Sequence, residues 1–299
     1  MIYDCFLFFN ELDLLEIRLN ILTPYVDKFV LVEMDRTHSN EKKILFFEEN
    51  KKRFNQFLDK IIYIKVSDYP TEYKNAWTFE NYHRNMIHEG IKNCKEDDII
   101  IISDLDEIPD NKNIINYKNN KYRNELICLN QNVFCYFLNY KNISNFSWHG
   151  SKIVSYSTYK KYNLTPQIIR DNKTCRIIKN GGWHFTYLGG YEKIIYKIKS
   201  FAHQEFNNDK FLNETIKKKM EKGQDLFNNK NCHFIPIKPT SKSLPEFINK
   251  NHIQYHHLIY KEINIFRNIF KYITKKPYYL LKSLYSFIKK LIFNKSTNI

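Results

Sequence analysis

The chain has 299 residues, of which 43% are hydrophobic and 26% charged, and this composition indicates a globular rather than a disordered protein. Its formal net charge of +15 is typical of proteins that meet nucleic acid, anionic membranes or anionic substrates. No zinc-finger spacing or RNP-type aromatic motif occurs, so we expect no nucleic-acid partner. Six scattered cysteines without a C-x-x-C pair favour reduced thiols and a cytoplasmic location. We also predict no signal peptide and no membrane-spanning helix, because no apolar run reaches about 18 residues.

Strands and helices alternate along the first part of the chain. The strands are predicted at residues 2–9, 28–33, 61–66 and 99–102. The first helix between them is opened by Asn10–Asp13 and ended by Pro24, and the next two are predicted at 46–58 and 77–93. Asn10 is the expected N-cap of the first helix. Such alternation is typical of βαβ units, so we predict an α/β protein with a mostly parallel central sheet.

The ends of these strands predict where a ligand binds. Ligands of open α/β sheets lie beyond the carboxyl ends of the strands. This rule brings four segments around one crevice: Asn10–Glu11, Glu33–Asn40, Ser67–Asp68 and Asp104–Asp106.

The second half of the chain is less regular. Its predicted elements are a pair of strands within 126–140, polar turns at 148–152 and 170–176, a glycine-opened aromatic segment at 181–187, and helices around 194–198 and at 209–222. Residues 263–299 differ in kind, because Leu280, Leu284 and Ile288 recur at helical spacing among lysines. We therefore predict a domain of residues 1–262 and a basic amphipathic C-terminal helix that lies on an anionic membrane surface.

Asp104 and Asp106 are the most informative residues. They follow the apolar run Ile99–Ile102, which is typical of a buried strand. Two carboxylates one residue apart repel each other unless a cation neutralises them. Mg²⁺ and Mn²⁺ prefer oxygen ligands and are often bound by one or two carboxylates together with substrate phosphates. The pair therefore predicts a site for a metal and a diphosphate, although an acidic turn is the simpler alternative.

Other polar residues are compatible with two interpretations. His184 follows a glycine pair and an aromatic residue, and His203 lies two residues before Glu205. Either histidine would serve as a further metal ligand and Glu205 as a catalytic base, but local sequence alone favours packing or surface roles for all three. Arg84 lies on the helix before the acidic pair, where it would bind a diphosphate, pair with the carboxylates or simply face solvent.

Taken in order, several segments resemble glycosyltransferase family 17, which includes the enzyme that adds bisecting GlcNAc to N-glycans. The similar segments span about residues 3–255 and comprise 4–19, 26–33, the loop at Thr37, 80–84, 101–109, 182–185 and 200–203. The resemblance implies a GT-A fold, a nucleotide-sugar donor, a divalent metal, and inversion at the anomeric carbon.

The resemblance also suggests a role for each candidate residue. Asp106 would bind Mn²⁺ or Mg²⁺, and Asp104 would bind the ribose or a metal-bound water. His203 or His184 would complete the metal shell. The nucleotide-sugar would contact Asn10, Glu11, Glu33, Thr37 and Arg84. The first candidate for the base that deprotonates the acceptor is Glu205, and the second is Asp225.

Three features distinguish the chain from animal members of the family. It shows no N-terminal signal anchor, it carries Tyr82-His83 before Arg84, and it ends in the basic tail. We therefore expect an enzyme at the inner leaflet that moves a sugar, GlcNAc from UDP-GlcNAc in the first place, to a glycan or lipid-linked acceptor in a β linkage. The alternatives are a sugar-phosphate or nucleotidyl transferase, and a non-catalytic glycan-binding protein on the same fold.

Overall fold

The computed structural model describes residues 1–261 except 70–74, 123, 145 and 230–231. Its strands are β1 (Ile2–Phe8), β2 (Lys28–Met34), β3 (Ile61–Val66), β4 (Ile99–Asp104), β5 (Glu107–Pro109), β6 (Ile127–Cys135), β7 (Tyr140–Asn142), β8 (Trp148–Ser155), β9 (Arg176–Ile178), β10 (Gly182–Thr186) and β11 (Phe234–Pro236). Its α-helices are α1 (Leu12–Leu22), α2 (Phe46–Glu49), α3 (Ala76–Asn85), α4 (Ile87–Ile91), α5 (Asn111–Lys118), α6 (Tyr156–Lys161), α7 (Pro166–Asp171), α8 (Tyr191–Ser200), α9 (Thr215–Lys222) and α10 (Glu246–Asn251). Three short 3-10 helices span Lys51–Phe57, Gln204–Phe206 and His256–Leu258.

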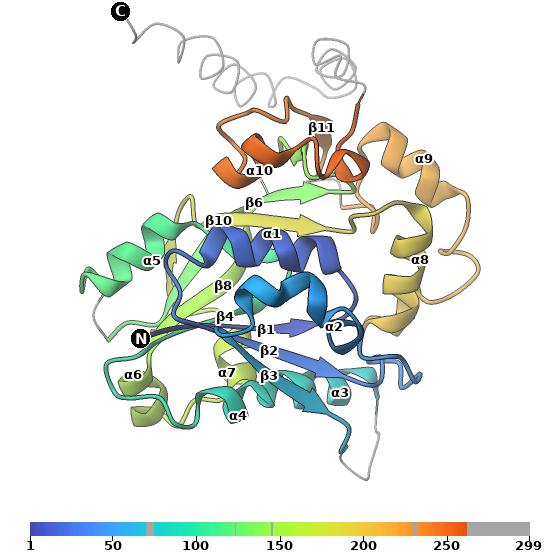
Figure 1. The fold of residues 1–299 in the computed structure, drawn as a ribbon. Coiled ribbons are helices and arrows are strands. Elements are labelled where there is room, and N and C mark those ends of the chain that lie inside the picture. The colour runs from blue at the N-terminus through green and yellow to red at the C-terminus, as the bar shows by residue number, and fades with distance from the viewer. Residues whose placement is uncertain (70–74, 123, 145, 230–231, 262–299) are drawn as a thin grey trace, which may run out of the picture.

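One sheet runs through the molecule in the order β11-β7-β6-β8-β4-β1-β2-β3 (Figure 1). Strands β4, β1, β2 and β3 are parallel neighbours, as predicted for the first half of the chain. Strand β8 then joins β4 to β6 with antiparallel pairing on both sides, and β10 pairs parallel with β6. The α/β class is therefore confirmed, with a parallel half and a mixed half.

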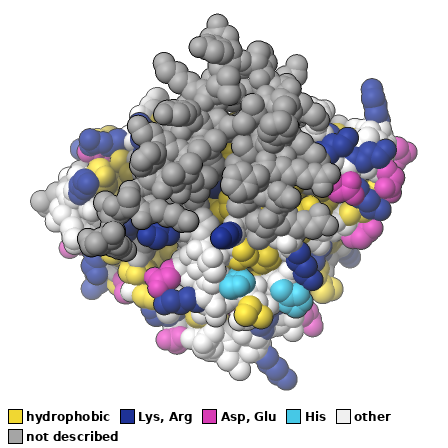
Figure 2. All heavy atoms as spheres, turned by 90° about the horizontal axis from the view of Figure 1, so that it is seen from above, with side chains coloured by type: hydrophobic (Ala, Val, Ile, Leu, Met, Phe, Trp, Pro, Cys, Tyr) yellow, Lys and Arg dark blue, Asp and Glu magenta, His cyan; other side chains and the backbone are white. Residues whose placement is uncertain are grey.

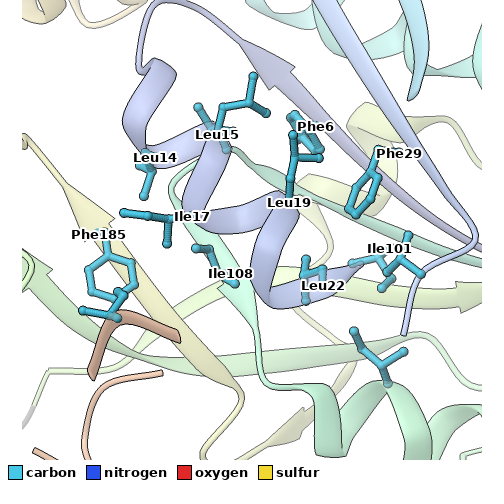
Figure 3. Packing of buried hydrophobic residues seen from close by; sticks show 14 of the residues in the cluster. Phe6, Leu14, Leu15, Ile17, Leu19, Leu22, Phe29, Ile101, Ile108 and Phe185 are labelled. Atoms are coloured by element: carbon cyan, nitrogen blue, oxygen red, sulfur yellow. The ribbon is translucent and has the colours of Figure 1, made fainter. Parts of the chain in front are cut away.

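The alternation of side chains along the strands divides the core into two layers. Phe6 and Phe29 face α1, whose buried side chains include Leu15, Ile17 and Leu19 (Figure 3). The opposite face packs against α3, α4, α6 and α7, as Figure 1 shows. Because both faces are covered, the central strands are apolar almost throughout and the carboxyl ends of the parallel strands are the place left for polar side chains.

Several predicted elements differ in the structure. The helix expected at 46–58 is a short α2 followed by a kinked 3-10 helix, and the helix expected at 77–93 is broken at Met86 into α3 and α4. The turn predicted at 148–152 is wrong, because these residues begin β8. These residues form a strand because β6 pairs with them, and Ser151 and Lys152 find hydrogen-bond acceptors inside the fold. The turn predicted at 170–176 is also corrected, since it contains the end of α7 and the start of β9.

The helix predicted within 263–299 lies outside the described residues, and its membrane role stays a prediction. None of the helices in the described ranges is long and apolar enough to cross a membrane. Lys and Arg side chains are spread around the face seen in Figure 2 and do not gather into one patch there.

Candidate active site

A cavity of about 650 Å³ opens at the carboxyl ends of β1, β2 and β4. Eight of the residues singled out in the sequence line it: Glu11, Thr37, Arg84, Asp104, Asp106, His184, His203 and Asp225. Three others, Asn10, Glu33 and Glu205, do not line it. The crevice predicted from strand order is thus a real cavity, but Ser67 and Asp68 after β3 do not line it, and it also receives residues from the second half of the chain.

Arg18 holds the turn that carries the two aspartates. Its guanidinium is fully buried and forms a bidentate pair with Asp4 on β1, at 2.8 and 2.6 Å. The same group donates to the backbone carbonyls of Asp104, Leu105 and Glu107 at 2.9 to 3.0 Å. Because one rigid donor fork satisfies three carbonyls, the turn after β4 is fixed before any ligand binds.

Asp104 lies between two arginines. Arg84 on α3 contacts one of its oxygens at 2.6 Å, and Arg170 on α7 contacts the other at 2.8 Å. Burial alone raises the pKa of the Asp104 carboxyl, but the two guanidinium groups outweigh burial and hold that pKa well below its usual range. Arg84 is oriented further by Glu80 at 2.8 Å and by Gln167 at 2.9 Å.

Asp106 has a different pair of neighbours. Lys197 on α8 contacts its Oδ2 at 3.1 Å and also reaches Glu11 at 3.1 Å. The Nε2 atom of His184 lies 3.6 Å from the Oδ1 atom of Asp106. Burial raises the pKa of the Asp106 carboxyl, yet Lys197 and His184 together hold it well below the usual range. Both aspartates are therefore charged at neutral pH.

These lowered pKa values predict how acid affects stability. A carboxyl with a lower pKa in the folded than in the unfolded chain stabilises the fold above its unfolded pKa of about 3.9 and loses that contribution as the pH falls toward the folded value. We expect Asp104→Asn to lower the urea midpoint at pH 7 and the difference from the wild-type midpoint to shrink between about pH 5 and pH 3. Urea unfolding at several pH values measures this difference. A gap that stays constant across this range would contradict the assignment.

Glu107 is a buried carboxylate that orients other side chains of the same site. It is fully buried, and its carboxylate accepts hydrogen bonds from Trp148 at 2.7 Å and from Arg170 at 2.8 and 2.9 Å. Trp148 in turn stacks on His184 with ring centroids 4.4 Å apart. The imidazole thus presents Nε2 toward Asp106, while its buried Nδ1 has no hydrogen-bond partner among the described residues.

The wall after β2 carries further polar groups. Thr37 lines the cavity and accepts a hydrogen bond from the backbone of Glu41 at 3.0 Å. Glu33 lies behind this wall, where Lys43 and Tyr63 contact its carboxylate at 3.2 and 2.8 Å. Burial raises the pKa of Glu33 and lowers that of Lys43. Lys43 itself lines the cavity, so Glu33 acts on the site through Lys43.

The opposite part of the cavity is aromatic. Phe206 and Phe227 contact each other there with centroids 4.5 Å apart, next to Asp225. The Oδ2 atom of Asp225 accepts backbone hydrogen bonds from Phe227 and Asn229 at 2.8 and 2.9 Å, which orient the carboxylate. Glu205 instead pairs with His203 at 2.7 Å on the exposed rim, where its side chain is 57% exposed.

The four predicted metal ligands do not form one cluster. In the described part of the chain no group of three or more His, Cys, Asp and Glu side chains is arranged to hold a metal. Asp104 has both oxygens on arginines, and His203 is on the rim. Asp106 and His184 remain as a pair, and a separation of 3.6 Å suits two ligands of one cation whose other ligands are phosphate and water oxygens.

Sequence reasoning missed several residues of the site. Arg170 fell in a predicted turn, and nothing near it in the sequence indicates its contacts with Asp104 and Glu107. Lys197 lies on the helix that was predicted around 194–198, but its contact with Asp106 depends on how that helix packs. Trp148 was missed because residues 148–152 were predicted to form a turn and not the start of β8.

Comparison with known proteins identifies the family of this chain. The family model for glycosyltransferase family 17 matches residues 1–260, which include every described residue of the cavity. The chain belongs to glycosyltransferase family 17. The resemblance stated from the ordered motifs is thereby confirmed.

Individual relatives of this family 17 protein match a shorter stretch. The β-1,4-mannosyl-glycoprotein 4-β-N-acetylglucosaminyltransferases of Homo sapiens and Rattus norvegicus are each 31% identical over 107 residues, which is 33% of this chain. The match covers only 20% of the length of either relative. Among solved structures, S. aureus TarS 1-349 aligns with 74% of this chain and 72% of its own, at 9% identity and a TM-score of 0.39.

Proposed function

We propose that this protein is an inverting, metal-dependent glycosyltransferase of GT-A type that moves GlcNAc from UDP-GlcNAc to a glycan or lipid-linked acceptor in a β linkage. The observation that carries the proposal is the fixed turn of Asp104 to Glu107 inside a cavity at the ends of parallel strands. Family membership supports the transfer of a sugar, and the names of the matching relatives support GlcNAc as that sugar.

The donor would span the cationic part of the cavity. Thr37 and Lys43 on the loop after β2 would contact the nucleoside end of the donor, close to Glu11. Arg84 and Arg170 already hold Asp104 between them, and because both line the cavity their positive charges suit the oxygens of a diphosphate. The same cations would then stabilise the negative charge that develops on the leaving UDP.

A divalent cation fits beside Asp106 and His184. Their 3.6 Å separation leaves room for an ion that takes its remaining ligands from the donor diphosphate and from water. When bound, Mn²⁺ or Mg²⁺ supplies Lewis acidity toward the leaving diphosphate. Lys197 contacts the second oxygen of Asp106 and so keeps this carboxylate oriented toward the cavity.

Asp225 is the better placed of the two candidate bases. It lines the cavity and its carboxylate is oriented by two backbone N–H groups, whereas Glu205 does not line the cavity. In the proposed reaction Asp225 accepts the proton of the acceptor hydroxyl as that oxygen attacks the anomeric carbon. Attack from the face opposite the diphosphate inverts the configuration.

Asp225→Asn is therefore expected to lower kcat about 10²- to 10⁴-fold with little change in the KM for the donor, because only proton removal is lost. Glu205→Gln is the matched control and should keep activity within about threefold of the wild type, since surface substitutions away from the site have small effects. Steady-state kinetics on both variants measure the difference. A larger loss in Glu205→Gln than in Asp225→Asn would reverse the assignment of the base.

The reaction itself is tested by UDP release from a panel of UDP-sugars with Mn²⁺ and with excess chelator. We expect release above background with UDP-GlcNAc, faster with an acceptor glycan, and its loss on chelation. UDP binding without release from any donor would favour the glycan-binding alternative. The absence of both UDP binding and UDP release would refute the proposal.

A further inference from the structure

Three reactive side chains meet on the sheet outside the donor cavity. Lys152 on β8 is the register partner of Cys128 on β6, and its ammonium donates to the Cys128 sulfur at 2.8 Å. On the other side of Cys128, β9 pairs parallel with β6, and Ile177 is the register partner of Cys128. Cys175 directly precedes β9, and its thiol lies within hydrogen-bond reach of the Cys128 side chain. None of these residues lines the donor cavity.

The surroundings of Lys152 are unusual for a charged group. Lys152 and Cys128 are buried, with exposed fractions of 2% and 1%. The other acceptor of the ammonium is the carbonyl of His149 at 3.1 Å, and no carboxylate among the described residues pairs with it. A buried cation without a counter-ion is costly. The side-chain acceptor of this ammonium is the sulfur of Cys128.

Cys175 links this pair to solvent. It lies in the loop between α7 and β9 and is partly exposed, and its backbone N–H is held by the side chain of Asn172 at 2.8 Å. Burial raises the pKa of the Cys175 thiol, and the neighbouring Lys152 and Cys128 act on it in opposite directions. Because Cys175 is partly exposed and Cys128 is buried, an oxidant reaches Cys175 first, although the raised pKa of Cys175 slows its reaction with the oxidant.

We propose that Cys128 and Cys175 form a redox-sensitive thiol pair that hydroperoxides convert to a disulfide, with Lys152 activating Cys128. In the first step the Cys175 sulfur attacks hydrogen peroxide, the O–O bond breaks, and a sulfenic acid and water form. In the second step the Cys128 sulfur attacks the Cys175 sulfur and displaces hydroxide, and the proton of the Cys128 thiol neutralises this hydroxide to give water. Overall two thiols lose two electrons and one peroxide yields two waters.

The disulfide would restrain the loop that follows Arg170. That loop leads directly from α7, and Arg170 donates to the carbonyl of Gly150 at 3.1 Å as well as to Asp104. Because Cys175 lies in a loop rather than inside a strand, its backbone is able to move into the geometry that a disulfide requires. The pair thus places an oxidisable link beside, but outside, the proposed donor site.

The test treats the full-length protein with hydrogen peroxide and maps its six cysteines by thiol titration and peptide mass spectrometry. We expect the loss of two thiols, a linked peptide that contains Cys128 and Cys175, and full reversal by dithiothreitol. Lys152→Met, which keeps the length and removes the charge, should slow disulfide formation about tenfold or more because the Cys128 sulfur loses the ammonium that donates to it. Cys94→Ser serves as the control and should leave the rate unchanged.

Two results would overturn the proposal: wild-type protein in which Cys128 and Cys175 stay reduced while other cysteines oxidise, or a Lys152→Met variant that forms the bond at the wild-type rate. The first result is obtained with the wild-type protein, so misfolding of a variant cannot explain it. A cysteine sulfenic acid at Cys175 that accumulates in Cys128→Ser and is trapped by dimedone would support the order of steps. None of these readouts depends on glycosyl transfer.

Discussion

Asp106→Asn is expected to lower the rate of UDP release at least about 10²- to 10³-fold. Asp106 is the carboxylate that faces both Lys197 and His184, and its charge is maintained by the low pKa that these neighbours impose. The amide keeps the shape of the side chain and removes the charge. It therefore tests the electrostatic role of the group and not its volume.

The control for this variant is Asp209→Asn, at an exposed position outside the cavity, which should leave release unchanged. Circular dichroism and urea unfolding show whether Asp106→Asn stays folded, as we expect, because Lys197 keeps its contact with Glu11. A folded Asp106→Asn variant with wild-type turnover would remove Asp106 from the reaction.

Arg18→Met is expected to cost about 3–5 kcal/mol of unfolding free energy, because it leaves Asp4 as an unpaired charge in the core. It also leaves the carbonyls of Asp104, Leu105 and Glu107 without their donor. Such a loss is a large part of the stability of an ordinary domain. Urea unfolding at pH 7 measures it directly.

Arg53→Met provides the matched comparison. Arg53 contacts Asp13 and Glu16, both at 2.6 Å, but its side chain is 32% exposed. We expect this variant to lose only about 0–1 kcal/mol, because solvent screens surface ion pairs. If Arg18→Met destabilised the protein no more than Arg53→Met, Arg18 would not be the anchor of the turn.

The parallel half of the fold was predictable because its signal is local. Ile99–Ile102 reads as a buried strand without reference to the rest of the chain, and the polar residues that follow it are therefore placed at the cavity. β8 was not predictable in the same way. Its residues from Trp148 to Lys152 form a turn-like sequence, and they become a strand because β6 pairs with them and β4 joins on the other side from Lys152 onward.

The residues of the site also divide into those that local sequence predicts and those that only the packing of the fold brings together. Asp104 and Asp106 were found because their spacing and position carry chemical meaning, and Arg84 because it lies on the helix before them. Arg170 is 66 residues from Asp104 in sequence, and only the packing of α7 against the sheet brings it near. Glu33 shows the converse, since the end of β2 was predicted well while its side chain turns toward Lys43 and Tyr63 behind the cavity wall.

The central claim is that the cavity holds a UDP-sugar with its diphosphate at the Asp104–Asp106 turn. A crystal structure of the protein with UDP and Mn²⁺ tests it most directly, with anomalous scattering to locate manganese. We predict a manganese peak in contact with Asp106 and His184, the diphosphate beside Arg84 and Arg170, and the uridine toward Thr37. Nucleotide bound elsewhere, or bound in the cavity away from Asp106 with no manganese, would contradict the account.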